Sequence, residues 1–238
     1  MSPPPPSIYA IDPPPVNLIH SIAHSGSPPP TPSSPSYGID SPLGLVLSSL
    51  FAPLYLYATL RGKSTVWDTI LASLPPAAPS EAPALDVGCG RGLVLLKLAG
   101  RHTHAYGIDI FRGADQTSNT PEATYSNAAA LGVVEDTVLH AASFAVRFPF
   151  VDGAFALVTS SLAVHNAGRE GRRCAVREMA RVCAPGGRIV LVDLFGYFGE
   201  HRSVLEDEGW TDVVVSSVGW RMMFGLWPCQ MLVATKPP

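Results

Sequence analysis

The chain has 238 residues, of which 47% are hydrophobic, and its 16 basic and 19 acidic residues give a net charge of -3 at pH 7. A chain of this length can bury a sizeable core, in one domain with extensions or in two small domains. The slight excess of acid argues against a nucleic-acid binder, which needs a basic surface to neutralise phosphates. The four cysteines are scattered and form no C-x-x-C pair, so neither a zinc site nor a disulfide framework is predicted and a cytoplasmic location is expected.

Residues 1–40 are rich in proline and serine and contain no lysine or arginine. Proline lacks the backbone N–H that helices and sheets use, so this segment is predicted to be a disordered tail. Docking of its proline runs into an aromatic groove of another domain is the alternative.

Residues 41–60 form a run without any charge, and Arg61 and Lys63 follow directly. As a helix this run would be roughly 30 Å long, about the thickness of the hydrocarbon core of a bilayer. Pro53 and several hydroxyl side chains argue against a spanning helix. Residues 41–63 are therefore predicted to form an apolar helix that spans a membrane, lies in its interface, or covers the entrance of an apolar substrate site.

Residues 64–238 alternate between amphipathic segments and short apolar runs, which predicts a doubly wound α/β domain with its ligand site at the carboxyl ends of the strands. The helices are expected over residues 64–74, 93–100, 121–131, 170–183 and 200–208. The strands are expected over residues 84–88, 104–110, 137–142, 155–161, 188–194, 212–218 and 229–235.

A glycine-rich loop, Asp86-Val87-Gly88-Cys89-Gly90-Arg91-Gly92, joins the first of these strands to the helix that follows. Glycines at such a junction permit a tight turn and let a ligand approach the backbone closely. Asp109 ends the next strand, where a carboxylate can bind both hydroxyls of a ribose. An adenosine-bearing ligand is therefore expected.

The spacing of the loop distinguishes between two such ligands. A dinucleotide site needs G-x-G-x-x-G, but Leu93 or Leu95 occupies the last position, depending on which glycine begins the count. Asp86, two residues before the first glycine, would repel a pyrophosphate and attract an amino group. S-adenosylmethionine has an amino group and no phosphate, so it is favoured over the cofactor of a dinucleotide-dependent oxidoreductase.

Four sequence blocks, LDVGCGRG, GIDI, RFPFVDGAFALV and RVCAPGGRIVLVD, follow one another along residues 85–193. Their order and spacing resemble those of class I S-adenosylmethionine-dependent methyltransferases, and most of all the small-molecule enzymes of the ubiquinone/menaquinone-biosynthesis group. The resemblance covers about residues 64–236. It implies S-adenosyl-L-methionine as cosubstrate and a Rossmann-like sheet of seven strands in the order 3-2-1-4-5-7-6, with the last strand antiparallel.

The resemblance also implies roles for single residues. Asp86 and Arg91 are expected at the methionine end of the cosubstrate, Asp109 at the ribose and Ile110 against the adenine. The residues expected at the cosubstrate are Asp86, Gly88, Cys89, Gly90, Arg91, Asp109, Ile110, Ser143, Phe144 and Ser160.

The chain departs from the family near the end of the third strand, where many relatives carry an acid that contacts the adenine amino group. Ser143 and Phe144 stand in that place. Phe144 is expected to stack on the ring, and Ser143 to replace part of the missing hydrogen bond. Because this acid is absent, a module that binds the cosubstrate without catalysis, as a partner domain, is the alternative function.

The acceptor side is expected at the ends of later strands. His165 follows the fourth strand and is the candidate general base, since histidine exchanges protons near neutral pH; Asn166 is expected to position the acceptor. A histidine that only hydrogen-bonds the backbone is the alternative. Trp220, Met223 and Phe224, between the last two strands, are expected either to wall an apolar acceptor site or to pack on the apolar helix.

No metal site is predicted, because Asp193 at the end of the fifth strand is followed by Leu194 rather than by a second ligand. Asp193 is expected to cap the strand. The sequence thus predicts an enzyme that transfers a methyl group to a small, lipophilic or aromatic acceptor.

Overall fold

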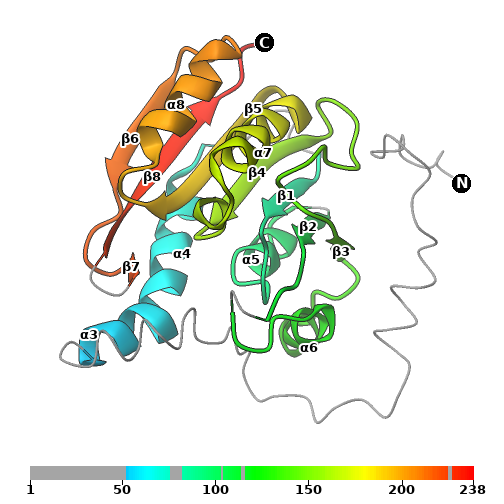
Figure 1. Cartoon of the computed structure of the whole chain (residues 1–238). Helices are drawn as coiled ribbons and strands as arrows, with labels where there is room; N and C mark the ends of the chain where they lie inside the picture. The colour runs from blue at the N-terminus through cyan, green and yellow to red at the C-terminus, as the bar shows by residue number, and fades with distance from the viewer. Residues whose placement is uncertain (1–51, 76–81, 103, 114–115, 225–226) are drawn as a thin grey trace, which may run out of the picture.

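The computed structural model describes residues 52–75, 82–102, 104–113, 116–224 and 227–238 (Figure 1). The predicted tail of residues 1–40, and residues 41–51 of the uncharged run, lie outside the described residues. The helices are α3 (Ala52–Tyr57), η2 (Ala58–Gly62), α4 (Lys63–Ser73), α5 (Leu95–Ala99), α6 (Pro121–Leu131), η3 (Val164–Asn166), α7 (Arg169–Val182) and α8 (Phe198–Asp207). The strands are β1 (Ala84–Val87), β2 (Ala105–Asp109), β3 (Thr137–Ala141), β4 (Phe155–Ser161), β5 (Cys183–Leu194), β6 (Val213–Ser217), β7 (Met223–Phe224) and β8 (Trp227–Thr235).

An eight-stranded sheet forms the centre of the fold, in the order β3-β2-β1-β4-β5-β8-β6, with the short strand β7 paired to β8. Strands β1 to β5 are parallel, and β8 runs antiparallel to both β5 and β6. The predicted order is confirmed, because the last long strand inserts between the fifth and the sixth. Strand β7 was not predicted; it is a two-residue addition just before β8.

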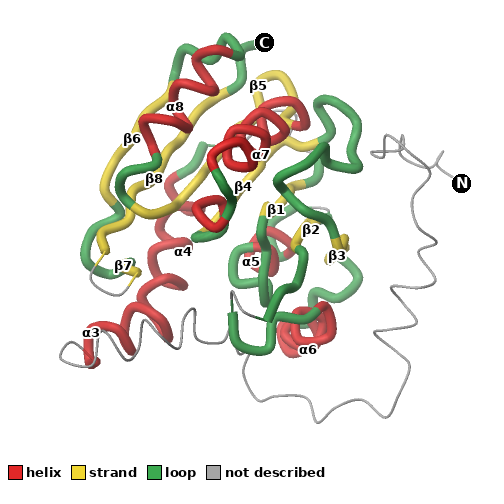
Figure 2. The backbone as a smooth tube through the Cα atoms, viewed as in Figure 1, coloured by secondary structure: helices red, strands yellow, loops and turns green. Residues whose placement is uncertain are grey.

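Helices cover both faces of this sheet, and α7 and α8 lie in front of it in Figure 2. One buried cluster joins these two helices to strand residues such as Leu85 and Leu191. A second cluster joins α4, α5 and α6 to their strand neighbours, among them Ala84 and Val190. Since successive side chains of a strand point to opposite faces, this alternation explains the near-continuous apolar runs in the sequence.

Local signals placed helix α6 correctly. Thr120 accepts a hydrogen bond from the N–H of Ala123 (3.2 Å), Pro121 is the first helical residue, and Gly132 ends the helix in the left-handed conformation. The predicted strand over residues 155–161 likewise coincides with β4.

Strand β5 begins at Cys183, directly after α7, and therefore includes Pro185, Gly186 and Gly187, which precede the strand expected over residues 188–194. The register against β4 shifts between the pairs made by Phe155 and Leu157, so the three residues lie at an irregularity of the ladder.

The N-terminal helices α3, η2 and α4 follow one another without a break from residue 52 to residue 73. The predicted boundary between the apolar helix and the α/β domain, between residues 63 and 64, therefore falls inside a continuous helical segment. The charged residues that begin at Arg61 do not interrupt the helix. Within the described residues, no helix combines the length and the apolar character that crossing a membrane requires.

Gly62, the last residue of η2, fixes this helical segment against the C-terminal part of the chain. A Cβ atom at this position would lie 1.9 Å from the carbonyl oxygen of Arg221. Beside this contact the rings of Tyr57 and Trp220 stack with centroids 5.5 Å apart. Only glycine permits this approach of two backbones.

Replacing Gly62 by alanine is expected to push the helix away from Arg221 and to lower the free energy of unfolding by about 1–3 kcal/mol, as over-packed sites do. Urea denaturation followed by tryptophan fluorescence measures this. The control is Gly199→Ala in α8, where the added Cβ meets no atom within 4 Å and a gain of up to about 1 kcal/mol is expected. Unchanged stability of the Gly62 variant would contradict the close approach.

Candidate functional site

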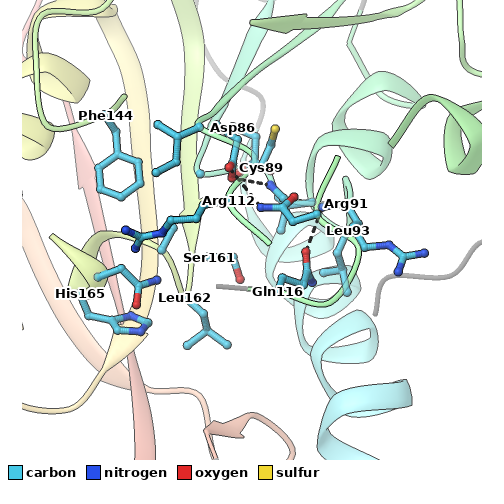
Figure 3. Close-up of a pocket in the computed structure, with 18 of the residues that line it drawn as sticks. Asp86, Cys89, Arg91, Leu93, Arg112, Gln116, Phe144, Ser161, Leu162 and His165 are labelled. Atoms are coloured by element: carbon cyan, nitrogen blue, oxygen red, sulfur yellow. Dashed lines mark hydrogen bonds between the residues drawn. The ribbon is translucent and has the colours of Figure 1, made fainter. Parts of the chain in front are cut away.

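A cavity of about 240 Å³ lies at the carboxyl ends of β1, β2 and β4, where the sequence places the ligand site (Figure 3). Its wall combines the glycine loop, the segment after β2, the segment after β4, and residues from the two ends of the described chain. Asp86, just before the glycine loop, is the most buried ionisable group among the described lining residues.

Asp86 is only 2% exposed. Its Oδ2 accepts a hydrogen bond from the N–H of Leu95 (3.1 Å), and its Oδ1 accepts one from the hydroxyl of Thr159 (2.8 Å). Burial raises the pKa of the Asp86 carboxyl to about 7, although both hydrogen bonds act in the opposite direction. The group is therefore balanced between its neutral and ionised forms at physiological pH, and a cation in the cavity would favour ionisation.

The glycine loop turns sharply, with φ of 72° at Gly88 and 50° at Gly90. A Cβ at Gly88 would lie 2.2 Å from the Cβ of Ala163, and a Cβ at Gly90 would lie 2.7 Å from Oε1 of Gln116. Glycine is thus required at Gly88 by conformation and by space, and at Gly90 by conformation, since the end of the Gln116 side chain can move aside.

Two polar side chains of α6 hold the loop from outside. The hydroxyl of Thr124 donates to the carbonyl of Gly90 (2.8 Å), and the amide of Asn127 donates to the carbonyl of Arg91 (2.9 Å). Neither residue was predicted from the sequence, since only their position on the inner face of α6 would have indicated them.

Asp109 closes the far side of the loop. Its Oδ2 accepts from the N–H of Gly90 (2.9 Å), while its Oδ1 accepts from the N–H of Phe111 (2.6 Å) and from the amide of Asn119 (3.3 Å). A carboxylate offers about four acceptor positions, so a ligand hydroxyl can still bind at Oδ2.

Two buried polar atoms in the wall, Oδ1 of Asn119 and Nε of Arg91, have no hydrogen-bond partner among the described residues. Buried polar atoms in proteins are normally paired, so orphaned ones beside a cavity indicate a polar ligand. An adenosine ligand that carries an amino acid would fit these groups. Asp86 can bind its amino group, the free position on Asp109 can bind a ribose hydroxyl, and the two orphaned atoms can form further hydrogen bonds.

Ile110, Ser143 and Phe144, which are expected near the adenine, all line the cavity. Ile110 is 45% exposed. The hydroxyl of Ser143 accepts a hydrogen bond from the N–H of Ala145 (3.1 Å), so part of its capacity stabilises its own turn. Phe144 lies across the cavity from Arg91 in Figure 3. The contact of these three residues with the adenine stays a prediction.

Ser160 does not line the cavity, whereas Ser161 does. Ser160 is buried, and its hydroxyl donates to the carbonyl of Val87 within the sheet (2.8 Å). Because side chains alternate along β4, the next serine faces the cavity instead; its hydroxyl accepts a hydrogen bond from the indole of Trp67 (2.9 Å). Ser161, rather than Ser160, is thus the serine of β4 that lines the cavity.

His165 and Asp193 form a hydrogen-bonded pair in the wall. The Nδ1 atom of His165 lies 2.5 Å from Oδ1 of Asp193, and the backbone N–H of His165 donates to Oδ2 of the same carboxylate (3.0 Å). Asp193 is fully buried and also accepts the N–H of Leu194 (2.8 Å), so it caps the strand as expected. The partner of the imidazole is therefore a carboxylate rather than the backbone.

Of the residues expected on the acceptor side, Asn166 and Phe224 line the cavity. The Phe224 ring lies 5.8 Å from that of His165. Trp220 and Met223 are not among the described lining residues: Trp220 is 59% exposed and stacks on Tyr57, as in the packing alternative.

Lys63 also lines the cavity, and it is only 5% exposed. From the sequence, Lys63 was expected only as part of the charged flank of the apolar run. In the described parts of the chain, no group of three or more His, Cys, Asp or Glu side chains is placed to hold a metal ion.

Residues 85–191 match the family model described as "Methyltransferase domain". A demethylmenaquinone methyltransferase from Mycolicibacterium vanbaalenii is 30% identical over 132 residues, which are 56% of this chain and 50% of the relative. An O-methyltransferase from Aspergillus sclerotiorum is 33% identical over 110 residues, covering 46% of this chain and 39% of the relative. The chain spans about half the length, or less, of these curated relatives.

Among solved structures, magnesium protoporphyrin IX methyltransferase from Synechocystis PCC 6803 with bound SAM superimposes with a TM-score of 0.57 at 17% identity. The match covers 77% of this chain and 83% of that one. At this identity the likeness concerns the fold, and it agrees with the strand order described above.

The titration of Asp86 is expected to appear in cosubstrate binding. A bound ammonium favours the ionised carboxylate, so the affinity for S-adenosylhomocysteine should rise between pH 6 and pH 8, by up to about tenfold per pH unit below the pKa. In Asp86→Asn the affinity should be low and should lack this rise. Isothermal titration calorimetry at several pH values measures both.

The same substitution should change stability in a defined direction. The folded-state pKa of Asp86 lies above its unfolded value, so the unfolded chain loses this proton first and stability falls as the pH rises from about 4 to about 7. Asparagine removes that loss, and the Tm of the variant should exceed that of the wild type more at pH 8 than at pH 4.5. Equal pH dependence in both proteins would contradict a buried, titrating Asp86.

Proposed function

We propose that the chain, of which residues 85–191 match a methyltransferase domain, is an S-adenosylmethionine-dependent methyltransferase that methylates a hydroxyl group of a small, lipophilic or aromatic molecule. One observation carries this proposal, the pairing of His165 with the buried Asp193 in the cavity wall. An O-methyltransferase among its relatives supports attack by oxygen. The alternative of a binding module without catalysis is not favoured, because it would have no use for such a pair.

The cosubstrate, when bound, supplies an electrophilic methyl group on a sulfonium. Asp86 and the N–H groups of the glycine loop would hold its amino acid end, and Asp109 its ribose. Accordingly the work of the protein is to align the acceptor, exclude water and take up the hydroxyl proton.

The Asp193 carboxylate accepts the Nδ1–H of His165, and this leaves the lone pair of Nε2 to accept a proton. As the imidazolium forms, the same carboxylate stabilises its charge, and the two bonds to His165 fix the ring in place. The cost of burying Asp193 is offset by these bonds and by the N–H of Leu194.

The part of the wall around His165 is apolar, which suits a lipophilic or aromatic acceptor. Phe224 approaches the imidazole edge-on, and the ring of Tyr197 stacks on it with centroids 6.5 Å apart. The apolar lining residues include Leu93, Val94, Phe144, Leu162, Ala163 and Phe224.

His165→Gln is expected to lower the rate of methyl transfer to 4-propylphenol, which is un-ionised at pH 8, by about 10²–10³-fold, since it removes the base. Transfer to 4-nitrophenol, which is ionised at that pH, should fall less than about tenfold. The affinity for S-adenosylhomocysteine should stay unchanged. Labelled S-adenosylmethionine gives the rates, and calorimetry the affinity.

Exposed His104, replaced in the same way, serves as the control and should leave both rates unchanged. Equal losses on the two phenols in His165→Gln would assign the histidine a structural role. If the wild-type protein binds S-adenosylhomocysteine and methylates no member of a broad panel of phenols, the non-catalytic alternative holds instead.

We further propose that an exposed apolar face beside the cavity contacts a lipid surface, from which a lipophilic acceptor would reach the site. Leu56 and Leu60, one helical turn apart, are 42% and 66% exposed, and Trp220 lies next to them against Tyr57. Arg61 and Arg221 add positive charge. Residues 52–67 and 213–235 contain no acid, and Asp68 and Asp212 lie just beyond these ranges. Tryptophan, leucine and arginine together favour an anionic membrane interface.

The full chain is therefore expected to sediment with vesicles that contain phosphatidylglycerol, and Leu60→Glu should weaken this binding by about tenfold or more. Leu131→Glu, at the end of α6, is the matched control because Leu131 is also exposed and lies on a different element. Sedimentation that is absent, or equal in the two variants, would refute a role for this face.

A further inference from the structure

We infer that Lys63 recognises the α-carboxylate of the methionine part of the cosubstrate. The inference rests on S-adenosylmethionine as the cosubstrate and is independent of the acceptor and of His165. Lys63 is the first residue of α4, directly after the π-helical turn, and it lines the same cavity as Asp86.

The position of Lys63 is imposed by backbone packing. Its N–H donates to the carbonyl of Ala58, and the preceding Gly62 lies against the carbonyl of Arg221. One turn later on α4, the indole of Trp67 donates to Ser161, at the end of β4. Contacts on both sides of Lys63 thus hold this turn of the helix over the cavity.

Lysine is almost never as buried as Lys63, which is 5% exposed, unless its ammonium group has a polar purpose. A lysine at a surface keeps its ammonium in water and buries only its methylene groups. Lys63 is instead a buried cation among the residues that line a ligand cavity.

The other cations in the wall are placed differently. Arg91 extends toward the segment before α6, where its Nη1 donates to the carbonyl of Thr117 (3.2 Å). Arg112 is exposed on the segment after β2, near the expected ribose site. Lys63 is therefore the buried cation among the described lining residues.

The amino acid end of the cosubstrate carries one ammonium and one carboxylate on a single carbon atom. Asp86 can neutralise the ammonium, but a carboxylate brought into the same buried site also needs a partner of opposite charge. A buried acid on β1 and a buried cation on α4 together match this zwitterion. The charge-assisted bond from an ammonium to a carboxylate is among the stronger hydrogen bonds in proteins.

Two ligands test the inference by calorimetry: S-adenosylhomocysteine, and the analogue in which the aminocarboxypropyl group is replaced by 3-aminopropyl. Lys63→Met is expected to weaken the binding of S-adenosylhomocysteine by about 10–100-fold and the binding of the analogue by less than about threefold. Lys63→Arg should retain most of the affinity. Thermal denaturation of each variant shows that it is folded.

Arg61→Met is the matched control, since it removes one charge from an exposed position two residues earlier and should change neither affinity. If Lys63→Met weakens the binding of both ligands equally, or of neither ligand, the inference is overturned. A raised KM for the acceptor alone would assign Lys63 to the acceptor instead. If the wild-type protein binds neither ligand, the proposed function is refuted, and this inference is refuted with it.

Discussion

The carboxyl group of Asp86 is buried where β1, the glycine loop, α5 and β4 meet, and the geometry of the site depends on how that burial is compensated. Its two oxygens bind the N–H of Leu95, at the start of α5, and the hydroxyl of Thr159 on β4. These bonds tie two strands and a helix to one side chain. They do not cancel the cost of burial, since the pKa remains raised to about 7. An asparagine could make similar bonds without that cost, so the retained acid indicates a cationic ligand.

The cavity above Asp86 is completed by segments from both ends of the described chain. Lys63 comes from the N-terminal helices and Phe224 from the short strand before β8. The contact between Gly62 and Arg221 joins these two segments. Both lie outside residues 85–191, the region shared with the methyltransferase family. The region that matches the family model therefore supplies most of the described cavity wall, and the two flanking segments complete it.

This division explains what could be predicted from sequence. Helix α6 and strand β4 carry their signals locally, in a capping threonine, a proline, a terminal glycine and an apolar run, and both were placed correctly. The strand order followed from the resemblance of the glycine loop and its companion blocks, and it is confirmed.

The pairing of His165 with Asp193 and the burial of Lys63 depend on contacts between distant parts of the chain. No local pattern encodes an imidazole that meets a carboxylate 28 residues later, although each was singled out separately. The same holds for the indole of Trp67, which meets Ser161 across 94 residues. Ser160 does not line the cavity for a different reason: side chains alternate along a strand, so a shift of one residue decides which serine faces the cavity.

Backbone strain is also concentrated at the cavity. Among the described residues other than glycine, positive φ occurs at Phe111, Ser118 and Leu162. Phe111 follows Asp109 and donates its N–H to that carboxylate, and Leu162 follows Ser161 and lines the cavity itself. Each such conformation costs on the order of 1–3 kcal/mol and persists only where the surrounding structure holds it in place. Here the sheet, which is covered by helices on both faces, holds these residues in place. Two of the three strained residues thus lie beside lining groups of the cavity, Phe111 near Asp109 and Leu162 next to Ser161, so a ligand bound at these groups would offset part of that cost in the free energy of unfolding.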